Sequence, residues 1–297
     1  MTRMSPMTRR DLRNGLLFIA PWVAGFLLFI AYPVGSSFYY SLTNFNILKT
    51  PRWIGLANYS DLIIKDDLFR LSLYNTLYYV VYAVPLGTAF SLAIAMLLNR
   101  KVPGLAFFRT IYYLPTLVPA VASSIIWIML LNPQFGIVNT LIRLVGLQAP
   151  GWLASPVWAK PALIMMSVWS MGGAMIIYLA ALQDVPEHLV EASLLDGAGP
   201  WQRFLNVTLP MISPAMLFNV IMGLIGGFQV FTTAYIMTSG GPNNATLFYA
   251  LYLYQNAFQY VKMGYASALA WLLLLITLLF TLLVMRSSAR LVYYGGE

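Results

Sequence analysis

The stretch EASLLDGAGPWQRFLNVTLP, residues 191–210, is a polar insert between two long apolar runs, broken in its middle by Gly197, Gly199 and Pro200. The chain around this insert has the composition of a membrane protein. Of its 297 residues 60% are hydrophobic and 9% are charged, and the mean hydropathy is +0.75. In soluble domains about a quarter of the residues are charged. The insert therefore belongs to a polytopic membrane protein, where a polar segment of this length needs a reason.

The apolar runs define the architecture. A bilayer core requires about 20 apolar residues per helix. The first run is too long for a signal peptide, contains Pro21, Trp22 and Pro33, and has no clear small-x-small cleavage site, so we expect it to remain as a helix. The sequence thus predicts an all-α membrane protein with six transmembrane helices, over 15–39, 73–98, 110–131, 159–182, 214–238 and 264–285. The membrane domain would cover 15–285, with tails over 1–14 and 286–297.

The basic residues predict the orientation, because cytoplasmic loops carry an excess of lysine and arginine. They lie before the first run, in the loop after the second run and in the tail: Arg3, Arg9, Arg10, Arg13, Arg100, Lys101, Arg109, Arg286 and Arg290. We therefore expect both termini and the segment 183–213 in the cytoplasm. The external segments would be 40–72, 132–158 and 239–263, and the rings of the last one suit an aromatic belt at the membrane surface.

The chain lacks the residues of several function classes. The six runs carry no Asp, Glu, Lys, Arg or His away from their ends, which disfavours a proton-driven carrier, a voltage-gated channel or an intramembrane hydrolase. The single histidine, His188, has no second histidine for an HExxH zinc site, and the chain has no cysteine. It also has no GxxxxGK[ST] phosphate loop. Uphill transport would need energy from another subunit, whereas sodium coupling through uncharged groups stays open.

The insert itself predicts a short helix with both ends marked. Pro186 suits a first helical turn, and DGAGP ends the helix. A second helical piece is expected from Pro200 until Pro210 breaks it. Glu187 and Glu191 are four residues apart and share one face. These features fit two interpretations, a plain connecting loop or a helix that receives force from a peripheral protein.

The insert also resembles a known motif. The run from Glu191 to Pro210 is similar to the EAA motif of the membrane subunits of binding-protein-dependent ABC importers, with Ser193 in place of the third motif residue. Other stretches resemble the sugar-type permeases of that family, over about residues 40–285: GLANY (55–59), NTLYY (75–79), GIVN (136–139), TSGGPNNAT (238–246) and GYASA (264–268). The family includes the larger membrane subunit of the maltose transporter and the glycerol-3-phosphate permease subunits.

This resemblance implies a type I ABC importer permease fold in a bacterial or archaeal cytoplasmic (inner) membrane. It implies a coupling helix over about 184–202 that binds an ATPase subunit, with contacts from Glu187, Glu191, Ala192, Ser193, Asp196, Gly197 and Gly199. The expected partners are a second permease subunit, two ATPase subunits and an extracytoplasmic solute-binding protein. The chain would hold no cofactor of its own, because ATP and magnesium would be bound by the ATPase subunits. It would not be an enzyme.

The resemblance also implies a solute pathway near the middle of the membrane, lined by the fourth and fifth runs. The matching positions are Met166, Trp169, Ser170, Gly173, Gly223, Gly226, Gly227 and Val230. Met166, Gly227 and Val230 stand where the maltose subunit has asparagines, so the sequence leaves the sugar open. Trp169 could stack on a sugar ring and Gln229 could bond a hydroxyl, although a tryptophan or a glycine in a helix bundle also serves packing.

Together these features predict one subunit of an ATP-driven importer that moves a sugar, oligosaccharide or related polyol by alternating access. The alternative is a stand-alone channel or a sodium-coupled secondary carrier that needs no ATPase. A third possibility, a catalytic membrane enzyme, is disfavoured because ionisable groups are absent from the interior of the runs.

Overall fold

The computed structural model describes residues 6–100, 103–288, 292 and 293, and most of them are helical. Within these ranges β structure is limited to two isolated bridges, between Thr43 and Trp53 and between Asn46 and Lys49. The all-α prediction is confirmed. Parts of the predicted tails, residues 1–5, 289–291 and 294–297, and the loop residue Lys101 lie outside the described residues.

Six segments are apolar enough to cross a membrane, if each of two bent helix pairs counts as one span. Four are single long segments, Arg10–Ser41, Asp67–Leu98, Pro200–Phe228 and Met263–Ser288. The bent pairs are Leu105–Leu117 with Ala120–Leu130, and Ala159–Trp169 with Gly172–Gln183. Each predicted run thus corresponds to one of these segments, with differences in shape and boundary.

The chain divides into two compact units, which we describe separately. Unit 1 comprises Met1–Lys65 and Tyr254–Leu272. It contains the first span, made of α1 (Pro6–Phe26), η1 (Leu27–Ala31) and α2 (Tyr32–Ser41), together with α3 (Ala57–Lys65), η3 (Gln255–Gln259) and the first part of α15 (Met263–Ser288). Trp271 of α15 donates its Nε1–H to Ser37 Oγ of α2 at 3.1 Å. A Cβ at Gly264 would lie 2.2 Å from Thr43 O, so only glycine allows this approach.

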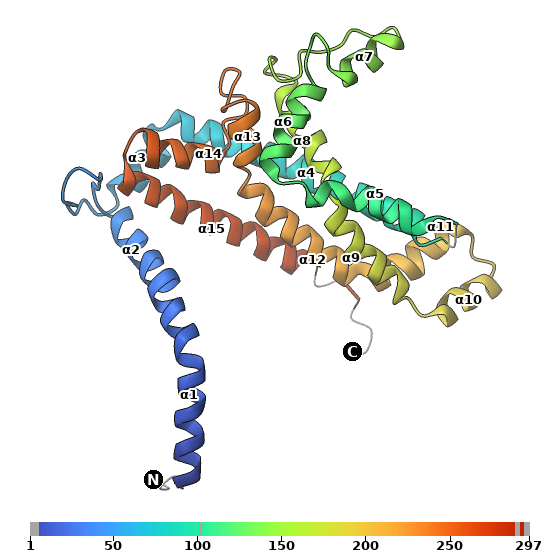
Figure 1. The fold of residues 1–297 in the computed structure, drawn as a ribbon, viewed down its shortest axis with the longest axis horizontal. Coiled ribbons are helices and arrows are strands. Elements are labelled where there is room, and N and C mark those ends of the chain that lie inside the picture. The colour runs from blue at the N-terminus through green and yellow to red at the C-terminus, as the bar shows by residue number, and fades with distance from the viewer. Residues whose placement is uncertain (1–5, 101–102, 289–291, 294–297) are drawn as a thin grey trace. The chain divides into compact units, whose positions relative to one another are not determined.

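Unit 2 comprises Asp66–Leu253 and Leu273–Glu297, and α4 (Asp67–Leu98) runs through its centre. Asp66 caps this helix by accepting the Phe69 N–H at 2.9 Å. α4 packs against α8 (Ala159–Trp169), α9 (Gly172–Gln183) and α12 (Leu209–Phe228) (Figure 1). A buried apolar cluster joins α4, α9 and α12, and it includes Leu92, Ala95, Leu98, Met175, Tyr178, Leu179 and Ile212. The remaining helices of this unit are α5–α7, α10, α11, α13 and α14.

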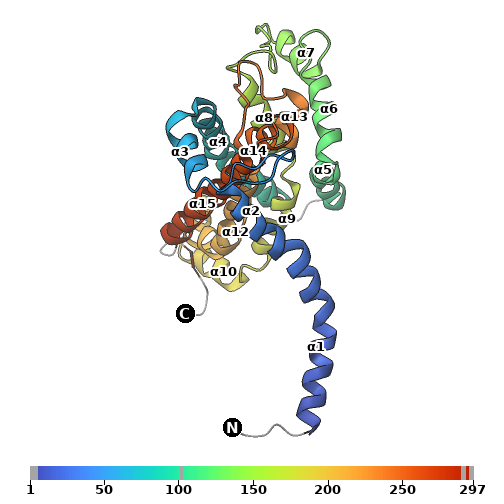
Figure 2. The ribbon, with the colours of Figure 1, turned by 90° about the vertical axis from the view of Figure 1, so that its left-hand side faces the viewer.

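The third predicted span is two helices. α5 (Leu105–Leu117) and α6 (Ala120–Leu130) meet at 102°, and Figure 2 shows α6 leading on to α7 (Ile137–Leu144). The chain turns at Val118, whose backbone is extended (φ −76°, ψ 125°) because Pro119 follows it. The continuous helix predicted over 110–131 is therefore wrong in shape, although its ends are close.

The fifth predicted span, 214–238, is also shifted. α11 (Pro200–Arg203), the π-helical η2 (Phe204–Thr208) and α12 form one continuous helical segment that ends at Phe228, before the short α13 (Thr232–Met237). Pro210 does not break this segment, contrary to the prediction. It lies in the first turn of α12, directly after the π turn, in which the Leu209 N–H bonds to Phe204 O. The wider π turn accommodates a residue that has no N–H to donate to the preceding turn.

The aromatic segment after residue 239 differs in part from the predicted belt. Phe258 and Tyr260 are exposed, whereas Phe248, Tyr249 and Tyr252 are buried and lie in or beside α14 (Tyr249–Tyr254). The Tyr249 ring packs edge-on against Phe69 at 5.7 Å, and the Tyr252 hydroxyl donates to Asp66 Oδ2 at 2.6 Å. These rings serve the protein core rather than the membrane surface.

Candidate functional site

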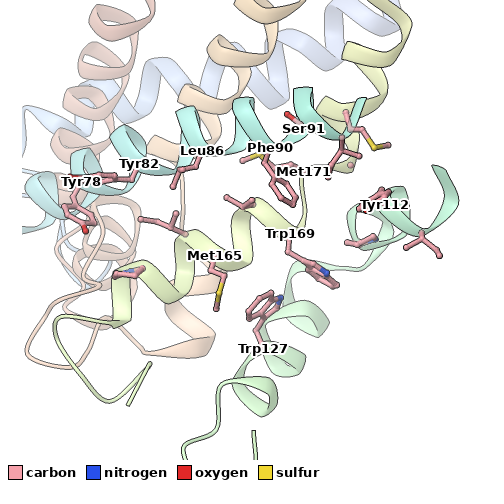
Figure 3. A pocket seen from close by; sticks show the side chains of 18 residues that line it. Tyr78, Tyr82, Leu86, Phe90, Ser91, Tyr112, Trp127, Met165, Trp169 and Met171 are labelled. Carbon is pink, nitrogen blue, oxygen red and sulfur yellow. The ribbon is translucent and has the colours of Figure 1, made fainter. Parts of the chain in front are cut away.

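A cavity of about 740 Å³ lies within unit 2, between α4, α5, α6, α8 and α9. One face of α4 forms a wall, because Tyr78, Tyr82, Leu86 and Phe90 recur every four residues. Figure 3 shows this row opposite α8, with the rings of Tyr112, Trp127 and Trp169 around the far end. The lining is therefore mainly aromatic and aliphatic, a surface suited to the apolar faces of sugar rings.

The break between α8 and α9 positions Trp169. α8 ends at this residue, α9 begins at Gly172, and the two helices meet at 46°. Thr116 Oγ1 of α5 donates to Ser170 O at 3.2 Å, which ties the break to α5. A Cβ at Gly172 would lie 2.5 Å from Thr116 Oγ1 and 2.7 Å from Tyr112 O. Glycine at this position therefore permits α5 and α9 to approach each other.

Trp169 also contacts a second tryptophan of the lining. Its ring meets that of Trp127 edge-on, with centroids 5.9 Å apart. Trp127 Nε1 is buried and has no hydrogen-bond acceptor among the described residues. A buried donor without a partner is costly, and this nitrogen has almost no accessible surface, so it is enclosed by protein atoms rather than open to the cavity.

The predicted pathway residues are spread over several places. Trp169 lines the cavity, whereas Gly223 lines a smaller one of about 440 Å³ that includes Asn219 and Thr88. Gly227 packs closely on Val80, because a Cβ added at Gly227 would lie 2.9 Å from Val80 Cγ2. Among the other predicted residues, Met166 is buried, Ser170 and Val230 are half-buried, and Gln229 is exposed. A Cβ added at Gly173 would contact Thr116, whereas one added at Gly226 would have no atom within 4 Å. Their role in solute contact stays a prediction.

Several lining residues were not predicted. They are the rings of Tyr78, Tyr82, Phe90 and Tyr112, together with Trp127 and the methionines Met165 and Met171. The four-residue spacing along α4 was a usable signal, since it places aromatic residues on one face of a helix. The contribution of α5 and α6 had no such signal, because it depends on the bend at Val118.

The insert forms the predicted short helix, α10 (Glu187–Leu195), directly after Pro186. It ends at Leu195, and Gly197 follows two residues later with a left-handed backbone (φ 76°). The Ala198 N–H bonds to Ser193 O at 2.9 Å and the Gly197 N–H to Leu194 O at 3.1 Å. This pattern ends a helix sharply and favours glycine at the left-handed position. Gly199 then begins α11, with its N–H bonded to Gln202 Oε1 at 3.0 Å.

The exposed surface of this segment combines charge with apolar side chains. Glu187 and Glu191 are exposed on α10, as are Ala192 and Asp196. Leu195 is 90% exposed and Trp201 of α11 is 69% exposed. Such large apolar side chains beside two carboxylates are typical of a protein-binding surface.

Basic residues of the same chain lie near the acidic face. Glu187 and Glu191 line a cavity of about 950 Å³ together with Arg100, Arg109 and Arg203. Within the described residues, neither glutamate has a basic nitrogen within 4.0 Å. The glutamates therefore remain available to a basic group of a partner, although their own chain already supplies positive charge nearby. The sequence did not indicate this grouping.

The comparisons with known proteins identify the family of the chain. The sequence model of the family described as "Binding-protein-dependent transport system inner membrane component" matches residues 83–292. This chain belongs to that family. The range includes both bent helix pairs, the insert and α12, whereas the first span, α3 and the first part of α4, with Tyr78 and Tyr82, precede it.

Relatives of this permease align over nearly their whole length. It is 40% identical to the probable ABC transporter permease protein YesP of Bacillus subtilis (strain 168), over 99% of this chain and 96% of the relative. It is 30% identical to the trehalose/maltose transport system permease protein MalF of Thermococcus litoralis, over 95% of this chain and 96% of the relative. It is 35% identical to the lactose transport system permease protein LacF of Rhizobium radiobacter, over 88% of this chain and 89% of the relative.

The fold of the permease is that of a solved ABC importer. A crystal structure of a bacterial ABC transporter involved in the import of the acidic polysaccharide alginate matches it with a TM-score of 0.82 and 24% identity, over 96% of this chain and 99% of that one. The protein is therefore a multi-pass membrane transport subunit with the type I ABC importer permease fold. The alternative of a stand-alone channel or sodium-coupled carrier is not supported.

Proposed function

We propose that this permease carries a sugar, oligosaccharide or related polyol by alternating access. The observation that carries the solute class is the aromatic lining of the 740 Å³ cavity, in which the rings of Trp127 and Trp169 meet edge-on. Aromatic rings present flat apolar faces on which the apolar faces of sugar rings stack. Two relatives named for trehalose/maltose and lactose transport support the same class.

We further propose that α10 and α11 couple this solute path to ATP hydrolysis in partner subunits. Exposed Leu195 and Trp201 would supply apolar contact, and Glu187 and Glu191 would meet a basic group of the ATPase. Ala192, Ser193, Asp196, Gly197 and Gly199 complete the coupling segment. ATP and magnesium would be held by the ATPase subunits, with no cofactor on this chain.

The proposed assembly places this chain beside a second permease, two ATPase subunits and an extracytoplasmic solute-binding protein. A solved alginate transporter in complex with a pentasaccharide-bound periplasmic protein has the same fold. The membrane would be the cytoplasmic (inner) membrane of a bacterium or archaeon. The arginine distribution supports cytoplasmic termini.

Uptake by reconstituted liposomes tests the proposed function. The complex purified through this chain is expected to contain a P-loop ATPase and to concentrate a labelled neutral saccharide only with ATP and the binding protein. A panel of maltose, trehalose, lactose and their longer homologues covers the solute class. Uptake of an amino acid but of no saccharide would refute the solute class, and uptake by this chain alone without ATP would refute the coupling.

A further inference from the structure

Lys160 is a charged residue at the edge of the aromatic cavity, and the function proposed above does not use it. It is the second residue of α8, and the next residue, Pro161, lines the cavity. Its ammonium lies 4.9 Å from the ring centroid of Tyr78, another lining residue. A carboxylate that entered this end of the cavity would therefore experience its charge.

The ammonium is held by three uncharged groups. Lys160 Nζ donates to Asn75 Oδ1 at 2.9 Å, and it lies over the ring of Tyr74, at 5.2 Å from the centroid, as well as that of Tyr78. No carboxylate lies within 4.0 Å of Lys160 among the described residues. The positive charge is thus held in place without being neutralised.

Asn75 fixes the position of the ammonium from behind. Its side chain is fully buried, and its Nδ2 donates to Asn244 O at 2.9 Å and to Leu247 O at 3.2 Å. Because both amide protons have acceptors, Oδ1 is the atom that faces Lys160. The contact is consequently set by the loop after α13 as well as by α4 and α8.

Lys160 lies at the end of its span and is half-buried, so its ammonium is only partly removed from water. Even at such a position a charge that is fixed by neighbouring groups and has no counterion attracts an anion. Contacts with rings offset only part of the cost of removing an ammonium from water. An anionic group in the cavity would supply the missing negative charge.

We propose that Lys160 selects for solutes that carry a carboxylate, such as oligosaccharides that contain a uronic acid. This inference rests on the proposed function and narrows its substrate class. Lys160 acts as a specificity residue at one end of the cavity, while the aromatic rings bind the neutral sugar faces. The alternative is a purely structural role, in which the Lys160 side chain only holds Asn75 and the loop after α13 in place.

Two trisaccharides that differ only in the group at C6, a carboxylate or a hydroxymethyl group, distinguish these two roles. We would measure the equilibrium binding of labelled trigalacturonate and of its carboxyl-reduced form, α-1,4-galactotriose, to the complete importer complex in nanodiscs without the binding protein. Lys160→Gln removes the charge and keeps a donor for Asn75, whereas Lys160→Arg keeps the charge. Lys49→Gln, at an exposed loop residue, is the control for the same change in net charge. The thermal midpoint of each complex reports the structural role.

The parent complex is expected to bind the acidic trisaccharide at least about tenfold more tightly, as for one charge-assisted hydrogen bond. Lys160→Gln should abolish this preference and leave galactotriose binding unchanged, while Lys160→Arg and Lys49→Gln retain it. A parent complex with no preference for trigalacturonate, including one that binds neither sugar, overturns the inference. So does a Lys160→Gln complex that keeps the preference or loses affinity for both sugars together with a lower midpoint. A complex that imports a neutral saccharide but shows no acidic preference refutes the role of Lys160 alone.

Discussion

Gly172→Ala tests whether the bend between α8 and α9 depends on close packing against α5. The added Cβ would lie 2.5 Å from Thr116 Oγ1, 2.7 Å from Tyr112 O and 2.9 Å from Tyr113 Cα. Two of these three atoms belong to backbone and cannot rotate away, so α5 or α9 must shift. Overpacking of this kind costs about 1–3 kcal/mol. The neighbouring Gly173→Ala is the matched control, because its Cβ would lie 3.7 Å from Thr116 Cγ2, an ordinary contact.

The assay is the unfolding of the purified complex, followed by tryptophan fluorescence. We expect Gly172→Ala to lower the thermal midpoint by several degrees, at about 2–4 °C per kcal/mol, and to weaken solute binding, because Trp169 ends the helix before the bend. Gly173→Ala should leave the midpoint unchanged. If the two variants have equal midpoints, close packing at Gly172 does not hold the bend and the reasoning fails.

Three further predictions concern the cavity, the topology and a buried hydrogen bond. Trp169→Ala should weaken solute transport while leaving basal ATP hydrolysis intact, and unchanged transport would remove this ring from the site. A cysteine in place of Asn243 should react with an impermeant thiol reagent in intact cells. A cysteine in place of Ser5, which lies outside the described residues, should be protected. The reverse labelling pattern would invert the predicted topology. Thr76→Val leaves the buried Tyr249 N–H without its 2.8 Å acceptor and should destabilise the complex by about 1–3 kcal/mol relative to Thr76→Ser. Equal unfolding midpoints for these two variants would show that the contact is dispensable.

The sequence predicts the helices whose apolar runs coincide with straight structure. α4 and α15 overlap the predicted 73–98 and 264–285 and end within three residues of them, because each run is bounded by polar residues and α4 continues through Pro85. The short helix of the insert was also predictable, since Pro186 and Gly197 mark its ends through their own backbone preferences. Local chemistry was sufficient in these cases.

The remaining features depend on contacts that no local pattern contains. The direction of the bend at Val118 is set by packing, for example of α6 against α13. Phe248 and Tyr249 looked suited to a membrane surface, yet they lie in the core because α4 supplies partners for them. The Lys160 site joins residues 85 positions apart, so its chemistry appears only when α4 and α8 are placed side by side.

Glu191→Lys tests whether α10 couples ATP hydrolysis in a partner ATPase to solute transport by this chain. The measurement is co-purification of the ATPase with this chain, together with solute-stimulated ATP hydrolysis in liposomes. Glu191 is exposed on α10 and has no basic partner within 4.0 Å in the described chain, so its reversal should act on the partner rather than on the fold. We predict normal accumulation of the variant, loss of the ATPase or of the solute response, and a smaller defect for Glu191→Ala, because only the lysine opposes the partner's positive charge. A Glu191→Lys complex that keeps its ATPase and hydrolyses ATP in response to solute like the parent would contradict the account.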